Sequence, residues 1–356
     1  MNTLVYGAYG FTGELVVSEI LDRELDVVVG GRNGTKTRTL GIERDVESRV
    51  FTPEETADNL DGVDVLLNCA GPFVRTYEPL VEACLATGTS YLDIAGELDV
   101  FEAIAERDRE AEEAGIFLLP GMGFEVVVTD CLARHLHDRL PGATDLQLGV
   151  DADVSVSGGT VATLIEHAGK RGYVRRDGVI QSVPVAARSR QINFGSGPRH
   201  AVTLPLADVS TAYYTTGIEN IETYVALPER VAQAVRLTSP LAPLVEPAPV
   251  KHGLQKLGRT LTGNPTRRER EHDRVFVWGE ARNGDRTVVS RLEAPGPYTT
   301  TVEATARAVA RLEAMDTHPT GFETPAIAFD ADFVLALDGV EGFFDEGREA
   351  PAVQRG

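Results

Sequence analysis

Residues 3–17 read TLVYGAYGFTGELVV, and this stretch decides the fold of the first part of the chain. An apolar run leads into three glycines, Gly7, Gly10 and Gly13, and an amphipathic segment follows them. A strand, a glycine turn and a helix in this order can cradle a diphosphate at the helix N-terminus. Gly7 would permit the tight turn, Gly10 would let backbone N–H groups approach the phosphates, and Gly13 would let the helix pack closely. We therefore expect a nucleotide site that includes Gly7, Tyr9, Gly10, Phe11, Thr12 and Gly13.

The end of the second predicted strand indicates which dinucleotide this site prefers. In VVVGGRNG, residues 27–34, Arg32 stands where NAD-binding domains usually carry an Asp or Glu for the ribose 2′-hydroxyl. A guanidinium can hold the 2′-phosphate of NADP through two parallel hydrogen bonds and can stack on adenine. Arg32 therefore favours NADP over NAD, with Thr12 and Arg38 as possible helpers.

Six short apolar runs alternate with helix-like segments between residues 3 and 121. Near-continuous apolar runs are typical of strands buried on both faces, and their alternation with helices predicts a parallel sheet. We expect an α/β Rossmann domain with a doubly wound parallel sheet over residues 1–125. The helix before the last of these strands should begin at a cap on Asp99 and end at Gly115. The six runs are residues 3–7, 26–31, 48–51, 63–71, 90–96 and 116–121.

The pattern changes near residue 126, where longer β-like segments appear with arginine, glycine and proline between them. Apolar positions flank Asn283-Gly284, which predicts a two-strand hairpin. Residues 299–315 are predicted to form a helix with an alanine-rich face suited to close packing on a sheet. These features predict a second, α+β domain with a mixed sheet over residues 126–315.

Two later strand ends should complete the nucleotide cleft, because ligands of open α/β sheets bind outside the carboxyl ends of the strands. The runs LLNCAGPF and YLDIAGE supply small and polar residues at these ends. Turn formation alone would also explain their glycines and proline. The additional cofactor-binding candidates are Asn68, Cys69, Ala70, Gly71, Pro72, Asp93 and Gly96.

Hydride transfer needs no protein nucleophile, so the catalytic candidates are proton donors near the cleft. Tyr77 is the most natural acid, because a carboxyl group is ionised at neutral pH unless burial raises its pKa. Glu125 is the second candidate, and helix capping is its alternative role. No tyrosine has a lysine four residues later, which argues against a short-chain dehydrogenase. No HExxH motif occurs, and His135 and His137 face different sides of a helix, so we expect no metal.

The charge balance is strongly acidic, with 54 acidic and 34 basic residues and a formal net charge of −20. Such a surface repels nucleic acid and anionic membranes. Only four of the basic residues are lysine, a balance typical of proteins from salt-accumulating cells. The three cysteines form no CxxC pair, and neither a targeting segment nor an apolar run long enough to span a membrane is evident. We expect a cytoplasmic, halophilic protein.

Taken in order along the chain, seven motifs resemble the saccharopine dehydrogenase-like oxidoreductases, and the set is closer to the trans-acting enoyl reductase-like branch. The resemblance implies a Rossmann domain, a mixed-sheet domain, and a C-terminal segment, residues 316–356, that returns toward the first domain and ends in a frayed tail. Where many relatives read Tyr-Gly-Glu-Pro, this chain has Thr76, Tyr77, Glu78 and Pro79. The motifs are GAYGFTG, GGRN, DVLLNCAGPF, EPLVEACLATGTSYLDIAGE, GMGFEVVVTD, SGGT and GFETPAIAFDADFVLALDG.

Three functions remain open at this stage. The first is an NADP-dependent oxidoreductase that reduces a C=C or C=N bond of a hydrophobic or lipid-linked small molecule. The second is a non-catalytic NAD(P)-binding sensor or scaffold. The third is a saccharopine-type amino acid dehydrogenase, which would need converging arginines, and a homodimer is left open for each. Further candidates for binding an anion or the cofactor are Arg75, Arg175, Arg176, Arg199, Gly158, Gly159 and Thr160.

Overall fold

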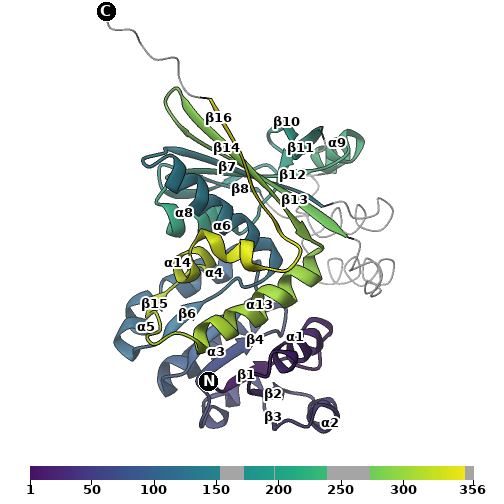
Figure 1. Cartoon of the computed structure of the whole chain (residues 1–356), viewed down its shortest axis with the longest axis vertical. Coiled ribbons are helices and arrows are strands. Elements are labelled where there is room, and N and C mark those ends of the chain that lie inside the picture. Colours follow the sequence, from purple (N-terminus) through teal and green to yellow (C-terminus); the bar gives the residue numbers. More distant parts are fainter. Residues whose placement is uncertain (153–171, 196, 239–272, 349–356) are drawn as a thin grey trace, which may run out of the picture. The chain divides into compact units, whose positions relative to one another are not determined.

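A computed structural model of the chain describes residues 1–152, 172–195, 197–238 and 273–348. The chain divides into two compact units. Unit 1 comprises Met1–Val127 and Pro297–Asp338, and unit 2 comprises Val128–Gly296 and Gly339–Gly356. Each unit is built around a sheet of its own (Figure 1).

The sheet of unit 1 is parallel, and its strands follow the order β15-β6-β5-β4-β1-β2-β3. The predicted doubly wound sheet is therefore confirmed, and a strand forms in each of the six predicted runs. The sequence did not predict the seventh strand, β15, which pairs with β6 at the edge of the sheet. The strands are β1 (Thr3–Tyr6), β2 (Val27–Gly31), β3 (Ser48–Val50), β4 (Val65–Asn68), β5 (Ser90–Asp93), β6 (Phe117–Leu119) and β15 (Gly321–Phe322).

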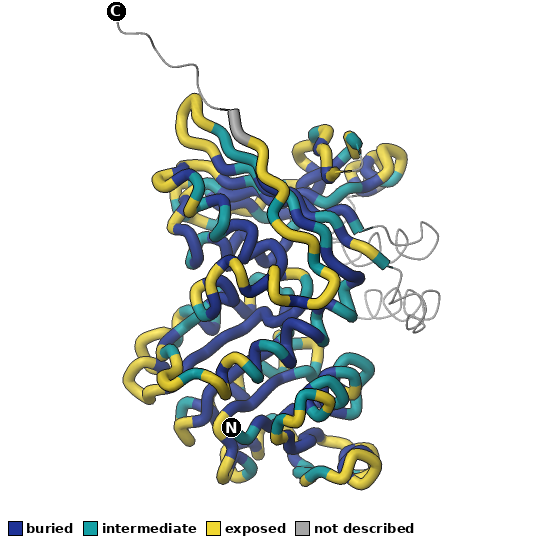
Figure 2. Tube along the Cα trace, viewed as in Figure 1, coloured by how far each residue is buried: buried dark blue, intermediate teal, exposed yellow. Residues whose placement is uncertain are grey.

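Helices and short 3-10 turns connect these strands, and the central strands form the core of unit 1. Leu4, Leu66, Leu92 and Leu118 are fully buried, and each such side chain contributes about 1.5–3 kcal/mol by leaving water. Figure 2 shows the strands in dark blue and many connecting turns in yellow. The helical elements are α1 (Phe11–Asp22), α2 (Gly34–Arg44), η1 (Pro53–Glu55), η2 (Ala57–Asn59), η3 (Phe73–Arg75), α3 (Tyr77–Thr87), α4 (Leu98–Ala105), α5 (Asp108–Ala114), α13 (Pro297–Glu313), α14 (Pro325–Phe329) and η5 (Ala331–Ala336).

The helix predicted from Asp99 to Gly115 forms as two helices, α4 and α5. The chain leaves α4 at Glu106, and the Arg107 N–H donates to the carbonyl of Ile104 in a tighter turn. Neither glycine nor proline marks the break, so the sequence carried no signal for it. The predicted end is confirmed, because Gly115 adopts a left-handed conformation at the C-terminus of α5. The start differs, since Glu97 and not Asp99 precedes the first helical residue.

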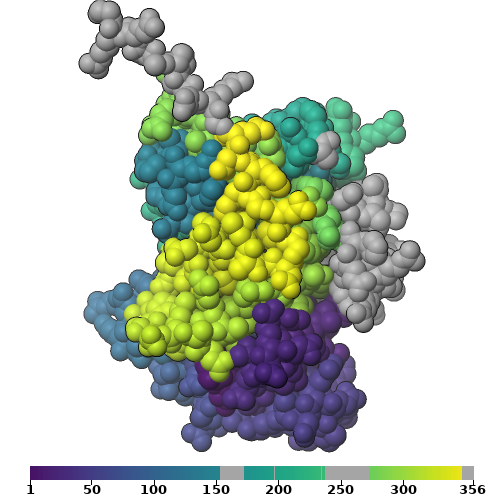
Figure 3. Space-filling view, in the orientation of Figure 1, coloured from purple at the N-terminus to yellow at the C-terminus, as the bar shows by residue number. Residues whose placement is uncertain are grey.

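Helix α13 lies in unit 1, although its sequence position placed it in the predicted second domain, residues 126–315. It packs against α1, where Arg23 forms an ion pair with Glu303. Its small side chains Ala304 and Ala308 are fully buried, which permits the close approach that the alanine-rich face predicted. Figure 3 shows yellow-green atoms of this region against the purple N-terminal residues.

Among the described residues, the sheet of unit 2 has nine strands and is mixed, as predicted: β12 and β7 are parallel, and the other described pairs are antiparallel. Helix α6 (Phe124–Arg139) covers one face, where Leu132 and Leu136 fill the space that a side chain at Gly279 would need. The strands are β7 (Asp145–Ala152), β8 (Gly172–Arg176), β9 (Val179–Val183), β10 (Ser189–Asn193), β11 (Pro198–Thr203), β12 (Asn220–Ala226), β13 (Arg274–Asn283), β14 (Arg286–Pro295) and β16 (Glu341–Arg348), and the further helices are α8 (Asp208–Thr216) and α9 (Glu229–Thr238).

Strands β13 and β14 form the hairpin that the sequence predicted. Asn283 pairs with Arg286, so the two turn residues are Gly284 and Asp285, one position later than expected. Gly284 has a φ of +55°, a conformation that glycine adopts readily.

The predicted C-terminal segment 316–356 divides between the units. β15, α14 and η5 belong to unit 1, whereas β16 pairs with β14 in unit 2. Residues 346–348 of the predicted frayed tail are part of β16, and residues 349–356 lie outside the described part of the chain.

Candidate functional site

The glycine turn after β1 has a geometry that requires two of its three glycines. Gly7 has a φ of +81°, and its N–H donates to the carbonyl of Gly30 at 2.9 Å. A Cβ on Gly13 would lie 2.5 Å from the carbonyl oxygen of Gly7, so only glycine lets α1 approach the turn this closely. Gly10 precedes the first helical residue, Phe11, and offers no side-chain cap. The helix therefore begins at Phe11, three residues earlier than the segment after Gly13 that the sequence predicted.

A pocket of about 440 Å³ lies beside this turn, at the carboxyl ends of β1, β2 and β4. Predicted cofactor-binding residues that line it are Gly7, Tyr9, Gly10, Arg32, Cys69, Ala70, Gly71 and Pro72. Further lining residues are Tyr6, Gly31, Thr52, Pro53, Glu54, Arg75 and Thr76. Thr52, Pro53 and Glu54 were not predicted from the sequence as pocket residues. They directly follow β3, so the strand-end rule that identified residues 68–72 also applies to them.

The charged residues of the pocket favour an anionic ligand. Arg32 is exposed at the end of β2, and no described residue forms a hydrogen bond or ion pair with its guanidinium. Arg75 also lines the pocket, and Glu54 is the one acidic residue in the described lining. The lining is thus net positive in a chain whose net charge is −20. Phosphate groups would be attracted to this pocket.

The helix N-terminus and an aromatic ring complete the nucleotide-binding features. The first N–H groups of α1 have no intrahelical acceptor and give this end a partial positive charge. The ring of Tyr9 packs on Gly31, where a Cβ would lie 2.5 Å from a ring carbon. Phe11, Thr12 and Gly13 belong to the first turn of α1 and do not line the pocket themselves.

Asn68 and Asp93, both predicted to contact the cofactor, are fully buried and do not line the pocket. The amide oxygen of Asn68 accepts the N–H of Ala70 at 2.9 Å. The carboxylate of Asp93 accepts the N–H groups of Ala95 and Gly121, each at 2.9 Å. These side chains support the loops behind the pocket because their polar atoms are directed at backbone groups.

Cys69 lines the pocket but remains a thiol at neutral pH. Burial raises its pKa to about 12, and the charge of Asp93 acts in the same direction. Burial likewise raises the pKa of Tyr6 to about 12. Neither residue can act as a base or an anionic nucleophile near neutral pH, although both can donate a hydrogen bond.

Tyr77, the predicted acid, does not line the nucleotide pocket. It is the first residue of α3 and borders a separate hollow of about 160 Å³ beside Glu78 and Arg107. Burial raises the pKa of Tyr77, which disfavours ionisation. The residue before it, Thr76, lines the pocket instead. The shift of the tyrosine by one residue, visible in the sequence, therefore removes the phenol from the pocket lining.

Gly96 and Glu125, the remaining predicted residues, lie against each other outside the pocket. A Cβ on Gly96 would overlap the carboxylate of Glu125. Glu125 is exposed in the first turn of α6, where a negative charge stabilises the helix dipole. This position fits the helix-start role that the sequence left open.

The comparison with known protein families supports the resemblance expected from the sequence. Residues 3–119 match the family described as the saccharopine dehydrogenase NADP binding domain. This part of the chain is similar to that domain, so the expected resemblance is confirmed. The NADP named in the family's description agrees with Arg32 at the end of β2.

Curated relatives match about half of the chain at low identity. A mouse protein named saccharopine dehydrogenase-like oxidoreductase is 25% identical over 205 residues, 49% of this chain and 48% of that protein. The trans-acting enoyl reductase of Mycobacterium ulcerans (strain Agy99) is 29% identical over 181 residues, 46% of this chain and 43% of that protein. The matched part thus spans about half the length of these relatives.

A solved structure extends the likeness in fold to nearly the whole chain. Apo saccharopine dehydrogenase (L-Glu forming) from Saccharomyces cerevisiae has a TM-score of 0.66, with 12% identity, over 98% of this chain and 100% of that one. At this identity the match concerns the fold. The mixed sheet of unit 2 accompanies the NADP-binding domain in that fold.

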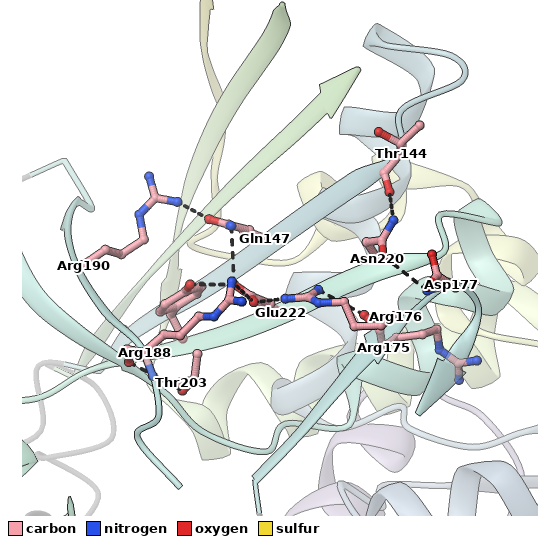
Figure 4. A network of polar contacts seen from close by, with 11 residues as sticks. Thr144, Gln147, Arg175, Arg176, Asp177, Arg188, Arg190, Thr203, Asn220 and Glu222 are labelled. Atoms are coloured by element: carbon pink, nitrogen blue, oxygen red, sulfur yellow. Dashed lines mark hydrogen bonds and ion pairs between the residues drawn. The ribbon is translucent and has the colours of Figure 1, made fainter. Parts of the chain in front are cut away.

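Three arginines in the described part of unit 2 are engaged with groups of the chain itself. Figure 4 shows Arg176 and Arg188 directed toward Glu222, which is 2% exposed. Arg175 donates to the carbonyl oxygens of Val209 and Gly178. These contacts stabilise the sheet, so these three guanidinium groups are not available as a pair for a dicarboxylate.

The described residues show neither a metal cluster nor a membrane-spanning helix. Within the described ranges, no group of three or more His, Cys, Asp or Glu side chains could hold a metal ion. No helix in that part of the chain is long and apolar enough to cross a bilayer. Gly158, Gly159 and Thr160 lie outside the described residues.

Proposed function

We propose that this protein is an NADP-dependent oxidoreductase that transfers a hydride to a C=C or C=N bond of a hydrophobic or lipid-linked small molecule. The observation that carries the proposal is the position of Arg32, exposed in the pocket lining at the end of β2, where the sequence Arg32-Asn33-Gly34 carries no Asp or Glu. A guanidinium in this position suits the additional phosphate of NADP. The names of the relatives, oxidoreductase and enoyl reductase, support hydride transfer.

The residues present fit the cofactor in three places. The Gly7–Gly10 turn and the first N–H groups of α1 would hold the diphosphate, and Arg32 would hold the 2′-phosphate. Ala70, Gly71 and Pro72 would lie beside the ribose and nicotinamide. When bound, the cofactor supplies the hydride. The chain supplies binding, orientation and the exclusion of water.

The proposed substrate class rests on the names of two relatives and on the neutral hydroxyl and thiol groups of the pocket lining. One relative is named trans-acting enoyl reductase, and another, from Caenorhabditis elegans, is named lipid droplet localized protein at 27% identity over 158 residues. The pocket lining carries neutral hydroxyl or thiol groups on Tyr6, Tyr9, Thr52, Cys69 and Thr76, of which Tyr6 and Thr76 already donate to the carbonyls of Phe51 and Ala70. Neutral donors suit the polarisation of a carbonyl conjugated to a C=C bond, which requires no base.

Turnover distinguishes this function from its alternatives. NADPH oxidation should be followed with an enoyl thioester, with a cyclic imine, with glutamate plus 2-aminoadipate 6-semialdehyde, and with 2-oxoglutarate plus lysine, each at saturating NADPH. We expect oxidation with the enoyl thioester or the cyclic imine. Tight NADPH binding without oxidation in any mixture would favour the sensor, and oxidation only with one of the two amino acid mixtures would favour the amino acid dehydrogenase.

We further propose a cytoplasmic, salt-rich setting and leave a homodimer as the assembly to test. The acidic surface and the scarcity of lysine support the salt-rich setting. Light scattering of the purified chain at low and multimolar KCl would give its mass in each condition. A monomer mass in both would exclude the dimer.

A further inference from the structure

A chain of buried hydrogen bonds connects the core of unit 1 to the nucleotide pocket. The hydroxyl of Tyr91 donates to Oδ2 of Asp93 at 3.0 Å, and the amide nitrogen of Asn68 donates to the Tyr91 hydroxyl at 3.1 Å. The same amide nitrogen donates to the hydroxyl of Thr76 at 3.2 Å. Thr76 lines the pocket, whereas Asn68, Tyr91 and Asp93 are all fully buried.

The direction of every bond in this chain is fixed by one backbone group. The Ala70 N–H can only donate, so the side-chain atom of Asn68 that faces it must be the carbonyl oxygen. The amide nitrogen of Asn68 must then face Tyr91 and Thr76 as a donor. Because the oxygen of Tyr91 accepts from Asn68, its proton is left for Asp93. Thr76, in turn, donates to the carbonyl of Ala70 at 2.9 Å.

This arrangement requires an ionised Asp93. The Oδ1 atom of Asp93 already accepts two backbone N–H groups, so an added proton would be carried by Oδ2. A protonated Oδ2 would donate to Tyr91, and the hydroxyl proton of Tyr91 would lose its acceptor inside the core. A buried donor without an acceptor is unfavourable. We therefore expect the bonds that join Tyr91 to Asn68, and Asn68 to Ala70 and Thr76, to weaken.

We propose that Asp93 and Tyr91 are positioning residues of the nucleotide pocket: ionised Asp93, acting through Tyr91 and Asn68, holds Ala70 and Thr76 in the shape that receives NADP. Protonation of Asp93 releases this shape and weakens cofactor binding. The inference rests on the proposed function, because it takes the pocket as the NADP site. It assigns to these buried residues a role in the pH dependence of binding.

The surroundings of Asp93 set the pH range of this effect. Burial raises the pKa of Asp93 to about 6, against the opposing contributions of the Ala95, Gly121 and Tyr91 hydrogen bonds. The titratable groups that face it are Tyr91 on β5, Cys69 after β4 and Glu97 before α4, whose charge raises the pKa further. Cofactor affinity should therefore fall as the pH falls through about 6.

Folding stability should respond in the opposite direction, which separates positioning from simple support of the fold. The folded-state pKa of Asp93 lies above the ordinary value of 3.8. The folded state therefore binds the proton more tightly, and this contribution to stability is lost as the pH rises from about 4 to about 6. If Asp93 positions the pocket, NADPH affinity rises with pH over the same range in which this stability contribution falls. Simple support of the fold would not produce these opposite trends.

The test compares NADPH dissociation constants of the whole chain and of Tyr91→Phe at pH 7.5 and pH 5. The 2′-phosphate of NADPH itself titrates near pH 6, so the ratio of the two proteins at each pH is the relevant quantity. The ratio should be about fivefold at pH 7.5, the size expected for one lost hydrogen bond, and should approach one at pH 5. Tyr224→Phe is the control, since it also removes a buried phenol–carboxylate bond, in unit 2.

A second measurement keeps the inference testable without the nucleotide. Hydrogen exchange of the Ala70 amide, corrected for intrinsic rates, should be faster in Tyr91→Phe than in Tyr224→Phe at pH 7.5 and equal in both at pH 5. A Tyr91→Phe effect that is the same at both pH values, or absent at both, would overturn the inference. Wild-type protein that fails to bind NADPH would overturn the proposed function, and exchange at Ala70 would then decide the inference alone.

Discussion

The Cβ of Ala70 lies 2.8 Å from the place that a Cβ on Gly7 would occupy. The turn after β1 and the loop after β4 are therefore in direct contact, and together they form one wall of the pocket. This contact explains why Gly7 is required, in addition to its φ of +81°.

Gly7→Ala should destabilise the protein by about 2–4 kcal/mol, because a left-handed backbone and steric overlap both oppose the new methyl group. Gly88→Ala is the matched control: Gly88 has a φ of +74° but nothing within 4 Å of its Cβ position. Gly88→Ala should lower the free energy of unfolding by only about 1 kcal/mol. Chemical denaturation measures both, and equal losses would show that the Ala70 contact is unimportant.

Glu222→Gln should destabilise the protein by about 3 kcal/mol, because it leaves Arg176 and Arg188 without their buried counter-charge. Glu346→Gln also removes an ion pair, that with Arg291, but at an exposed position. We expect this control to change stability by less than about 0.5 kcal/mol. Similar effects of the two substitutions in urea denaturation would contradict the structural role of Glu222.

Glu323 should make stability depend on pH. Burial, with a smaller contribution from Asp108, raises its pKa from 4.5 to about 7. The folded state therefore holds the proton more tightly, and the stability gained below pH 4.5 is lost as the pH rises through about 7. Glu323→Gln should raise the melting temperature at pH 8 and not at pH 5. Glu43→Gln, on an exposed face of α2, is the control, and a pH-independent effect of Glu323→Gln would exclude this role.

Salt should stabilise the protein. At ~1 M salt the Debye length falls to about 3 Å, which screens repulsion among the surface carboxylates that give the net charge of −20. We expect the melting temperature to rise between low and multimolar KCl. An unchanged melting temperature would contradict the halophilic assignment.

The sequence predicted the parts of the fold and site that depend on local pattern. Near-continuous apolar runs identified each of the first six strands, and the glycine spacing identified the turn at Gly7. Arg32 was predictable because it directly follows β2, and the strand-end rule places it at the cleft. These features require no knowledge of distant contacts.

The features that the sequence did not predict depend on partners far along the chain. Asn68 and Asp93 end their strands, as residues that line the pocket do. Their side chains instead form hydrogen bonds with Tyr91 and with backbone N–H groups, and so do not face the pocket. The alanine-rich face of α13 predicts close packing, but it does not predict that α1 is the packing partner. Tyr77 does not line the pocket, because a shift of one residue at the start of a helix moves a side chain to another face.

The preference for NADP is the central claim, and the affinities of Arg32→Ala for NADPH and NADH test it most directly. Arg44→Ala, an exposed arginine at the other end of α2, removes the same charge away from the pocket and serves as the control. Arg32→Ala should weaken NADPH binding at least about tenfold, as expected for a bidentate phosphate contact, and leave NADH binding nearly unchanged. Equal losses for the two nucleotides, or equal effects of the two substitutions, would contradict the account.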